Sequence, residues 1–191
     1  MVRALTFEYG GIAASEMHAA IRIAEASGVK QHRIVRLPDL KEAQDIGRGR
    51  YGGLPPTYIP MRNGIFYSFA ASYAEELRAA VVAGGHNADD LKVFRDVSPE
   101  FFSALQEAFW AGSKILQAEG TLIVRPLEGM SKVQVIRKAA RLGVPLQLTW
   151  SCHRDGASHC WECPGCRARI ASFRGAGVPD PLMVKSRAKI T

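Results

Sequence analysis

The order of apolar and polar positions along this chain alternates between strand-like runs and helix-like repeats. Residues 4–9, ALTFEY, form a short apolar-rich run, and residues 32–37, HRIVRL, alternate as a strand does. Residues 79–85, AAVVAGG, and 121–127, TLIVRPL, are continuous apolar runs typical of strands covered on both faces. Strands that alternate with helices predict an α/β fold, in which a parallel sheet carries helices on both faces.

Two helices are predicted before the third strand. The first follows Ser15 and stops at Gly28, and the second runs from Asn63 to about Arg78. Helical spacing places these residues toward the core: Met17, Ala20, Ile21 and Ala24 in the first helix, and Ile65, Phe66, Phe69, Ala70 and Tyr73 in the second. Between the second strand and the second helix, residues 41–60 are rich in glycine and proline. A loop of that length is usually functional or disordered.

Two more helices are predicted in the second half of the chain. Ser98 can cap the third, with Pro99 at its first position. Ser131 can cap the fourth, KVQVIRKAARLGV, which Gly143 and Pro145 end. The core stripe of the third helix is Phe102, Leu105, Phe109 and Leu116.

In parallel α/β sheets, ligands bind beyond the carboxyl ends of the strands. Three strand exits meet that description: residues 8–11, 84–90 and 125–127, the last of which leads to Ser131 and Lys132. Glycines at the first two exits allow the backbone to come close to a ligand. The sequence therefore predicts a binding site assembled from these exits.

Carboxylates and cations lie near the same exits. Asp89, Asp90 and Asp96 can hold magnesium beside phosphates or hydrogen-bond a base edge, or else serve as turn and cap residues. Arg62 and Asn63 stand where the long loop meets a helix N-terminus, a natural anion site. They are equally ordinary as cap and surface residues.

Composition and charge narrow the class of protein. The chain has 191 residues, an apolar content close to the globular average and a net charge of +7. No apolar run is long enough to span a membrane and the N-terminus has no secretory signal, so we expect a cytoplasmic protein. The positive charge favours anionic ligands such as nucleotides, although it also suits an uncommitted basic surface.

All four cysteines of the chain fall within one short stretch, with the spacing C-x7-C-x2-C-x2-C. Cysteines two residues apart can turn both thiolates toward one ion, and four thiolates complete the tetrahedron of a structural zinc site. Pro164 and Gly165 are expected to make the tight turn inside the last pair. An iron–sulfur cluster and redox-active thiols remain alternatives. His153 and His159 flank the cluster and could replace a cysteine as ligand, but with four thiols available they are expected to be solvated loop residues. The predicted ligands are Cys152, Cys160, Cys163 and Cys166.

Five segments, in order, resemble the 7-cyano-7-deazaguanine synthase (QueC) family, which belongs to the adenine-nucleotide α-hydrolase group. They are ALTFEYG, PPTYIPMRNGIFYSFAASYAEEL, GGHNADDLKVFRDVSPEFF, MSKVQVIRKAARLGVPLQLTWSC and AGVPDP. The resemblance implies a Rossmann-like fold, zinc on the four cysteines, and ATP with Mg²⁺ as co-substrate. It implies conversion of 7-carboxy-7-deazaguanine and ammonia to the nitrile, without nucleic acid or a membrane, by a chain that can form a homodimer. With the strand exits, it indicates these nucleotide- or substrate-binding residues: Tyr9, Gly10, Arg62, Asn63, Asp90, Asp96 and Lys132.

Two departures from the family pattern matter. The trio Q-R-H that follows Tyr-Gly in the family is replaced by Gly11, Ile12 and Ala13. The family's S-G-G-x-D-S loop, which cradles ATP phosphates, does not occur in this sequence. We therefore expect the sequence to lack the first βα unit, as a shortened gene product or a degenerate form, and to have little activity by itself.

The expected organisation is an incomplete nucleotide-binding domain over residues 1–150 with a zinc-binding segment over residues 151–191. A non-catalytic zinc module that binds RNA or a partner is an alternative, supported by the basic tail Lys185–Lys189. A tRNA-thiolating enzyme of the pyrophosphatase type is another.

Overall fold

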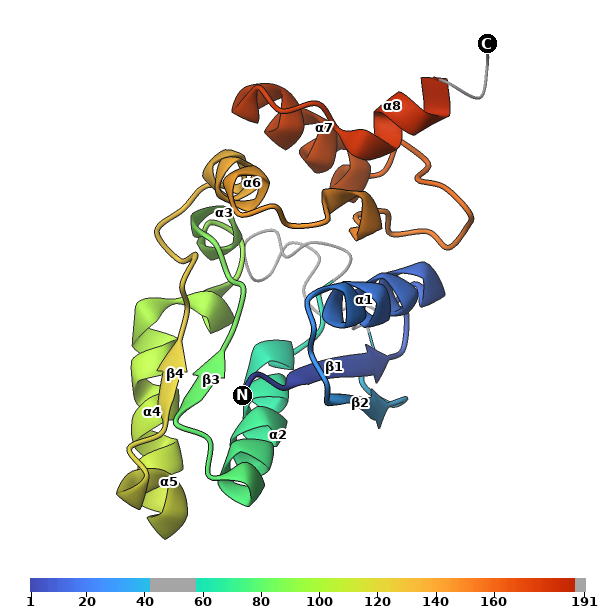
Figure 1. The fold of residues 1–191 in the computed structure, drawn as a ribbon. Helices are drawn as coiled ribbons and strands as arrows, with labels where there is room; N and C mark the ends of the chain where they lie inside the picture. The colour runs from blue at the N-terminus through green and yellow to red at the C-terminus, as the bar shows by residue number, and fades with distance from the viewer. Residues whose placement is uncertain (42–57, 188–191) are drawn as a thin grey trace. The chain divides into compact units, whose positions relative to one another are not determined.

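A computed structural model describes residues 1–41 and 58–187 (Figure 1). The chain forms two compact units, Met1–Asp39 with Lys132–Thr191, and Leu40–Ser131. Most of the loop predicted over residues 41–60 lies outside the described residues, as do the side chains of the basic tail Lys185–Lys189. Among the described residues, no helix has both the length and the apolar character needed to cross a bilayer.

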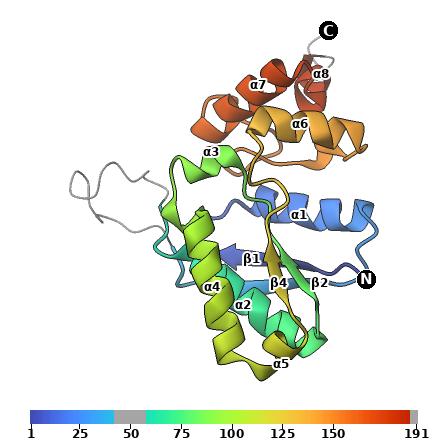
Figure 2. The ribbon, with the colours of Figure 1, turned by 90° about the vertical axis from the view of Figure 1, so that its left-hand side faces the viewer.

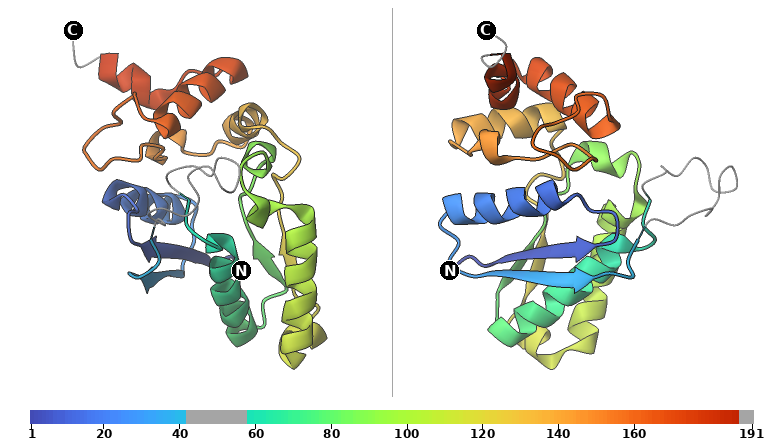
Figure 3. Two further views of the ribbon diagram at one scale, coloured as in Figure 1. Left: turned by 180° about the vertical axis from the view of Figure 1, so that it is seen from behind. Right: turned by 90° about the vertical axis from the view of Figure 1, so that its right-hand side faces the viewer.

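The first unit begins with a strand–helix–strand motif. Strand β1 (Ala4–Tyr9) and strand β2 (His32–Leu37) pair in parallel, from Ala4 opposite His32 to Tyr9 opposite Leu37. Helix α1 (Ala14–Ala26) connects them and packs on β1 (Figure 3). A parallel pair needs such a crossover, because both strands must run in the same direction.

The C-terminal part of the first unit is helical. It contains α6 (Lys132–Arg141), the 3₁₀ turn η2 (Leu146–Leu148), α7 (Pro164–Ala176) and α8 (Pro181–Arg187). Helices α6 and α7 pack together, and Arg137 of α6 donates hydrogen bonds to the carbonyls of Gly175 and Ala176. The segment between η2 and α7 holds the first three cysteines, and the fourth lies in the first turn of α7.

The second unit contains another parallel pair. Helix α2 (Arg62–Leu77) leads to β3 (Val81–Ala83), which pairs in parallel with β4 (Leu122–Val124). Between these strands lie α3 (Ala88–Leu91), the 3₁₀ turn η1 (Arg95–Val97), α4 (Pro99–Gly112) and α5 (Lys114–Ala118). Helix α4 runs beside β4 (Figure 2), and α2 contacts β3. The core of this unit is built on Tyr67, Val97 and Phe102, next to a second cluster of Ala71, Ala74 and Leu116.

The predicted strands form, and their pairing is parallel as expected. In the described residues, however, the hydrogen-bonded ladders make two sheets of two strands rather than one sheet.

The buried side predicted for α2 was wrong. Its buried residues are Asn63, Tyr67, Ala71 and Ala74, whereas Phe69 is 42% exposed. The reason is that α2 has apolar residues on several faces, so that its sequence supports more than one stripe. The third predicted helix also ends earlier than expected. Ser113 starts the new helix α5 by accepting a hydrogen bond from the Leu116 amide.

Candidate functional site

The four cysteines converge on one point. Their Sγ atoms all lie within 4.8 Å of one another, and the Cys160–Cys166 and Cys152–Cys163 pairs are each 3.9 Å apart. Zinc with Zn–S bonds of about 2.3 Å requires tetrahedral sulfurs about 3.8 Å apart, so the arrangement fits such an ion. Cys166 and Cys152 are 0% and 2% exposed, which leaves little access for water.

The start of α7 holds two of these sulfurs in place. Cys163 is the N-cap residue of α7, and its Sγ accepts a hydrogen bond from the Cys166 amide. Pro164 and Gly165 lie in the turn between Cys163 and Cys166, as predicted, and this turn is the first turn of the helix. Position 165 has to be glycine, because a side chain there would overlap the carbonyl oxygen of Ser151.

Backbone amides and burial shift the pKa values of three of these thiols in different directions. The N–H groups of Glu162 and Cys163 lower the pKa of Cys160 to about 6. Burial opposes ionisation of Cys163, yet the N–H groups of His153 and Cys166 leave its pKa below the ordinary value. Burial raises the pKa of Cys166 to about 12. A divalent ion bound by four thiolates would therefore release protons as it enters.

The two flanking histidines differ from each other. His153 is exposed, in line with the prediction. His159 is only 5% exposed, so its predicted solvation was wrong. Its Nε2 accepts a hydrogen bond from the Ser151 amide. Its ring packs against the rings of Trp150 and Trp161, whose centroids lie 4.3 and 5.1 Å from its own. A ring nitrogen engaged in this way is a support for the loop rather than a metal ligand.

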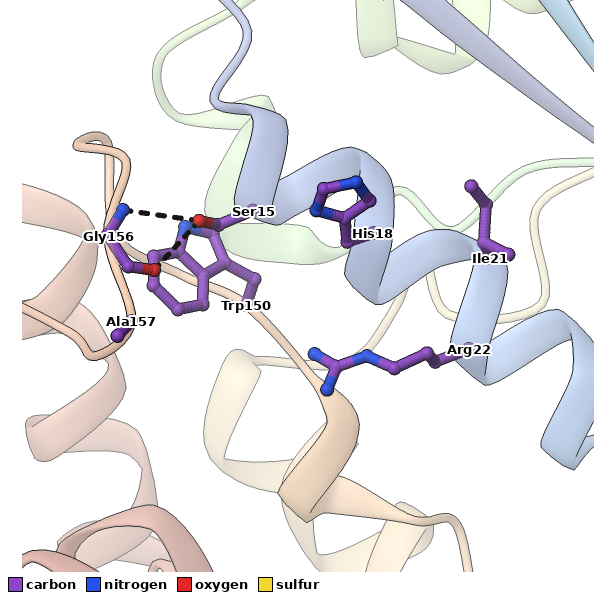
Figure 4. A pocket seen from close by; sticks show the side chains of 7 residues that line it. All are labelled: Ser15, His18, Ile21, Arg22, Trp150, Gly156 and Ala157. Carbon is purple, nitrogen blue, oxygen red and sulfur yellow. Dashed lines mark hydrogen bonds between the residues drawn. The ribbon is translucent and has the colours of Figure 1, made fainter.

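The cysteine-bearing loop is fastened to helix α1. The Asp155 carboxylate accepts a hydrogen bond from the Ser15 amide at 2.9 Å, and the Ser15 hydroxyl donates to the Gly156 carbonyl at 3.0 Å. The Gly156 amide donates back to the Ser15 oxygen at 3.3 Å. A pocket of 460 Å³ opens between the loop and α1 (Figure 4).

A second polar cluster lies in the other unit, where β3 and β4 end. His86 follows β3, is half-buried, and packs against Phe102 and Tyr67 with ring centroids 5.3 and 5.8 Å away. Arg125 follows β4; its guanidinium lies 4.6 Å above the Phe102 ring and pairs with Glu128 at 2.6 Å.

Burial dominates the electrostatics of His86. It lowers the pKa of His86 below the ordinary 6.5, while the charges of Asp90 and Asp96 oppose this and those of Arg125 and Arg62 add to it. The imidazole is therefore neutral near pH 7 and is surrounded by charges of both signs. Such a group can accept a proton from a bound acid.

The predicted site residues fall in both units. Arg62, Asn63, Asp90 and Asp96 lie in Leu40–Ser131, while Tyr9, Gly10, Lys132 and the four cysteines lie in the other unit. Asp96 accepts a hydrogen bond from the Asn63 amide at 3.2 Å. A carboxylate of the protein itself therefore occupies the anion site that was predicted at the start of α2. Asp90 closes a capping box with Asn87 at the start of α3. Tyr9 ends β1, Gly10 follows it in the turn, and Lys132 begins α6.

Sequence reasoning included His86 and Arg125 in the predicted strand exits without giving either a role of its own, and it did not select the residues of the pocket as a site. The first two follow predicted strands, so their position was a usable signal. The pocket brings together residues such as Ser15 and Gly156 that are 141 positions apart, and no local pattern announces that contact.

The fold and the four-sulfur cluster define an α/β protein with a site in its C-terminal segment that can hold a structural metal ion. A family model described as queuosine biosynthesis protein QueC matches residues 1–177, and the chain belongs to this family. The resemblance inferred from the motifs is thereby confirmed.

Curated relatives are similar in sequence to nearly the whole of this chain. The 7-cyano-7-deazaguanine synthase of Thermosynechococcus vestitus is 38% identical over 194 residues, covering 94% of this chain and 83% of that protein. The enzyme of the same name from Stenotrophomonas maltophilia is 38% identical over 192 residues, covering 95% and 87%. That from Thermoplasma acidophilum is 34% identical over 196 residues, covering 95% and 80%.

Proposed function

We propose that the protein containing this chain converts 7-carboxy-7-deazaguanine and ammonia, with ATP, to 7-cyano-7-deazaguanine, a precursor in queuosine or archaeosine synthesis. The observation that carries the proposal is the similarity, over 93–95% of the chain, to relatives named for that product. The four-cysteine cluster and the polar strand exits are consistent with it.

The chemistry has two activations. The substrate carboxylate attacks the α-phosphate of ATP, which releases pyrophosphate and gives an acyl adenylate. Ammonia then displaces AMP and forms the amide. The amide oxygen then attacks the α-phosphate of a second ATP, which releases pyrophosphate and leaves an adenylated imidate. Loss of AMP and of the two N–H protons leaves the nitrile. Each carboxylate oxygen departs as an oxygen of AMP, so the atoms balance.

The cluster at the ends of β3 and β4 supplies groups for this reaction. Arg62 and Arg125 provide positive charge that stabilises phosphate or carboxylate oxygens. Neutral His86 is suited to take a proton from the nitrogen once ammonia has attacked the adenylate, because the positively charged nitrogen of that adduct is far more acidic than free ammonium. Mg²⁺ enters with ATP and neutralises phosphate charge.

Zinc at the four cysteines has a structural role in this proposal. Four thiolates fill the tetrahedral coordination sphere, so no position is left for an activated water. Zinc on these cysteines would hold the segment between η2 and α7 in place and would take no part in nitrile formation.

Mass spectrometry of the product tests the proposal. The acid, ammonium, ATP and Mg²⁺ are incubated with the chain alone and with the chain joined to any in-frame residues encoded before Met1. ATP-dependent appearance of the nitrile from either protein supports the proposal. His86→Gln should slow conversion at least tenfold, whereas Lys114→Gln, exposed on α5, should not.

Unchanged acid with both proteins, each folded and metal-loaded, would contradict the proposal. Salt-sensitive RNA binding in the same preparations would then favour a zinc-bearing RNA-binding module, and sulfur transfer to tRNA would favour a thiolating enzyme.

A further inference from the structure

The pocket between α1 and the cysteine-bearing loop lies wholly within the first unit (Figure 4). Its volume of 460 Å³ falls in the range of about 300–1,000 Å³ that small-molecule sites occupy. We propose that it binds a planar heteroaromatic ring that carries a negative charge. Its lining residues are Ser15, His18, Ile21, Arg22, Trp150, Gly156 and Ala157.

The polar side of the pocket carries one cation, Arg22, beside the imidazole of His18. His18 and Arg22 lie one turn apart on α1, so their side chains project from the same face. Figure 4 shows Arg22 extended toward the side on which Trp150 lies, and the His18 ring over α1 between Ser15 and Ile21. None of the seven lining residues is acidic. The neighbouring Asp155 carboxylate is engaged with the Ser15 amide. An anionic group is thus the ligand that this side of the pocket favours.

The other side of the pocket is flat and apolar. The indole N–H of Trp150 donates to the Cys152 carbonyl at 2.8 Å, and its ring packs against buried His159. These two contacts fix the orientation of the indole before a ligand arrives. Aromatic side chains held in this way are stacking platforms for nucleobase-like rings. Ala157 of the same loop adds apolar surface on this side, and Ile21 adds it on the α1 side.

The wall of the pocket depends on the metal loop. Gly156 is held to Ser15 by hydrogen bonds in both directions, and Trp150 is attached to the backbone of the ligand residue Cys152. Removing the metal should therefore release both Gly156 and Trp150 from their positions in the pocket wall. Binding should be lost on chelation and restored by zinc.

Two sources supply the required ligand chemistry, and the choice between them rests on the proposed function. One is 7-carboxy-7-deazaguanine, a fused heteroaromatic ring with a carboxylate. The other is the adenine nucleotide, a purine with phosphates. Both would stack on Trp150 and place their anionic group by Arg22.

Isothermal titration calorimetry of the full metal-loaded chain provides the test. The probes are 7-carboxy-7-deazaguanine, AMP, and the neutral 7-cyano-7-deazaguanine. We expect saturable binding of the acid or of AMP, weakened about tenfold by Arg22→Gln, since a charge-assisted contact is lost. Arg141→Gln, exposed on α6 and outside the pocket, is the matched charge control and should leave affinity unchanged. The neutral nitrile should show no Arg22 dependence.

Tryptophan substitutions separate stacking from folding. Trp150→Ala should abolish binding, and Trp150→Phe, which keeps an aromatic face, should retain most of it if the metal content is intact. Binding of neither anion, or binding indifferent to both Arg22 and Trp150, would overturn the inference. Nitrile formation unaffected by these variants would leave the proposed function standing while removing the pocket from it. Arg22-dependent binding without nitrile formation would support the pocket and contradict the proposed function.

Discussion

At the residue scale, the ion pair between Arg169 and Asp180 is almost fully buried. Its N–O contacts are 2.6 and 2.9 Å, and Arg169 also donates to Thr149 and lies over the Phe173 ring. Asp180→Asn leaves the guanidinium buried without its counter-ion. We expect the free energy of unfolding in urea to fall by about 3 kcal/mol. Glu8→Gln, which breaks an exposed pair, should cost under about 1 kcal/mol. Equal effects of the two changes would contradict this account.

Gly84 is constrained by a neighbouring hydroxyl. A side chain at this position would overlap the hydroxyl oxygen of Tyr67, a group that has no hydrogen-bond partner among the described residues. Gly84→Ala should therefore destabilise the protein by about 2 kcal/mol in urea unfolding. Tyr67→Phe removes the obstructing oxygen and should itself be nearly neutral. The double variant should recover part of the loss, and an additive result would show that the two positions are not in contact.

His86 makes stability depend on pH. Its pKa in the folded protein lies below the ordinary 6.5, mainly because the ring is buried. Between the two values the unfolded chain binds more protons, so the stabilising contribution is complete above pH 6.5 and is lost as pH falls. Urea unfolding between about pH 8 and about pH 5 should show this slope, and His86→Gln should reduce it. An unchanged slope in the variant would contradict the assignment.

At the element scale, several helices take their N-terminal partners from distant parts of the chain. Helix α1 has no cap of its own and uses Asp155, and α2 uses Asp96. Helix α7, by contrast, is capped locally by the sulfur of its own N-cap residue, Cys163. A carboxylate or thiolate at such an end satisfies a free N–H group and the helix dipole together.

The cap on α1 can be removed selectively. Asp155→Ala should destabilise the first unit by about 1 kcal/mol and accelerate amide hydrogen exchange in the first turn of α1. Asp39→Ala, an exposed aspartate in the same unit, serves as the control. Unaltered exchange at Ser15 in the Asp155 variant would rule out the cap.

The sequence predicted the helices and strands better than the contacts between them. Local signals identified the strands, the Ser98 cap and the start of α4, because propensity and capping act within a few residues. The break at Ser113 and the exposure of Phe69 depend on packing against other elements, which no short window contains. Caps supplied from 140 residues away, such as that of Asp155 on Ser15, are invisible to local patterns.

At the scale of the whole molecule, the cysteine spacing was the most informative signal. It predicted that four sulfurs would meet, and they lie within 4.8 Å of one another. The same pattern did not show that the loop would carry the wall of a pocket. That result required Trp150, Gly156 and α1 to be placed in three dimensions.

The central claim is that a structural metal ion on four thiolates orders the C-terminal segment. X-ray absorption spectroscopy with elemental analysis of protein purified without added metal tests it most directly. We predict one zinc per chain bound by four sulfurs at about 2.3 Å. Substoichiometric metal, a nitrogen or oxygen ligand in place of a sulfur, or disulfides between these cysteines would contradict the claim.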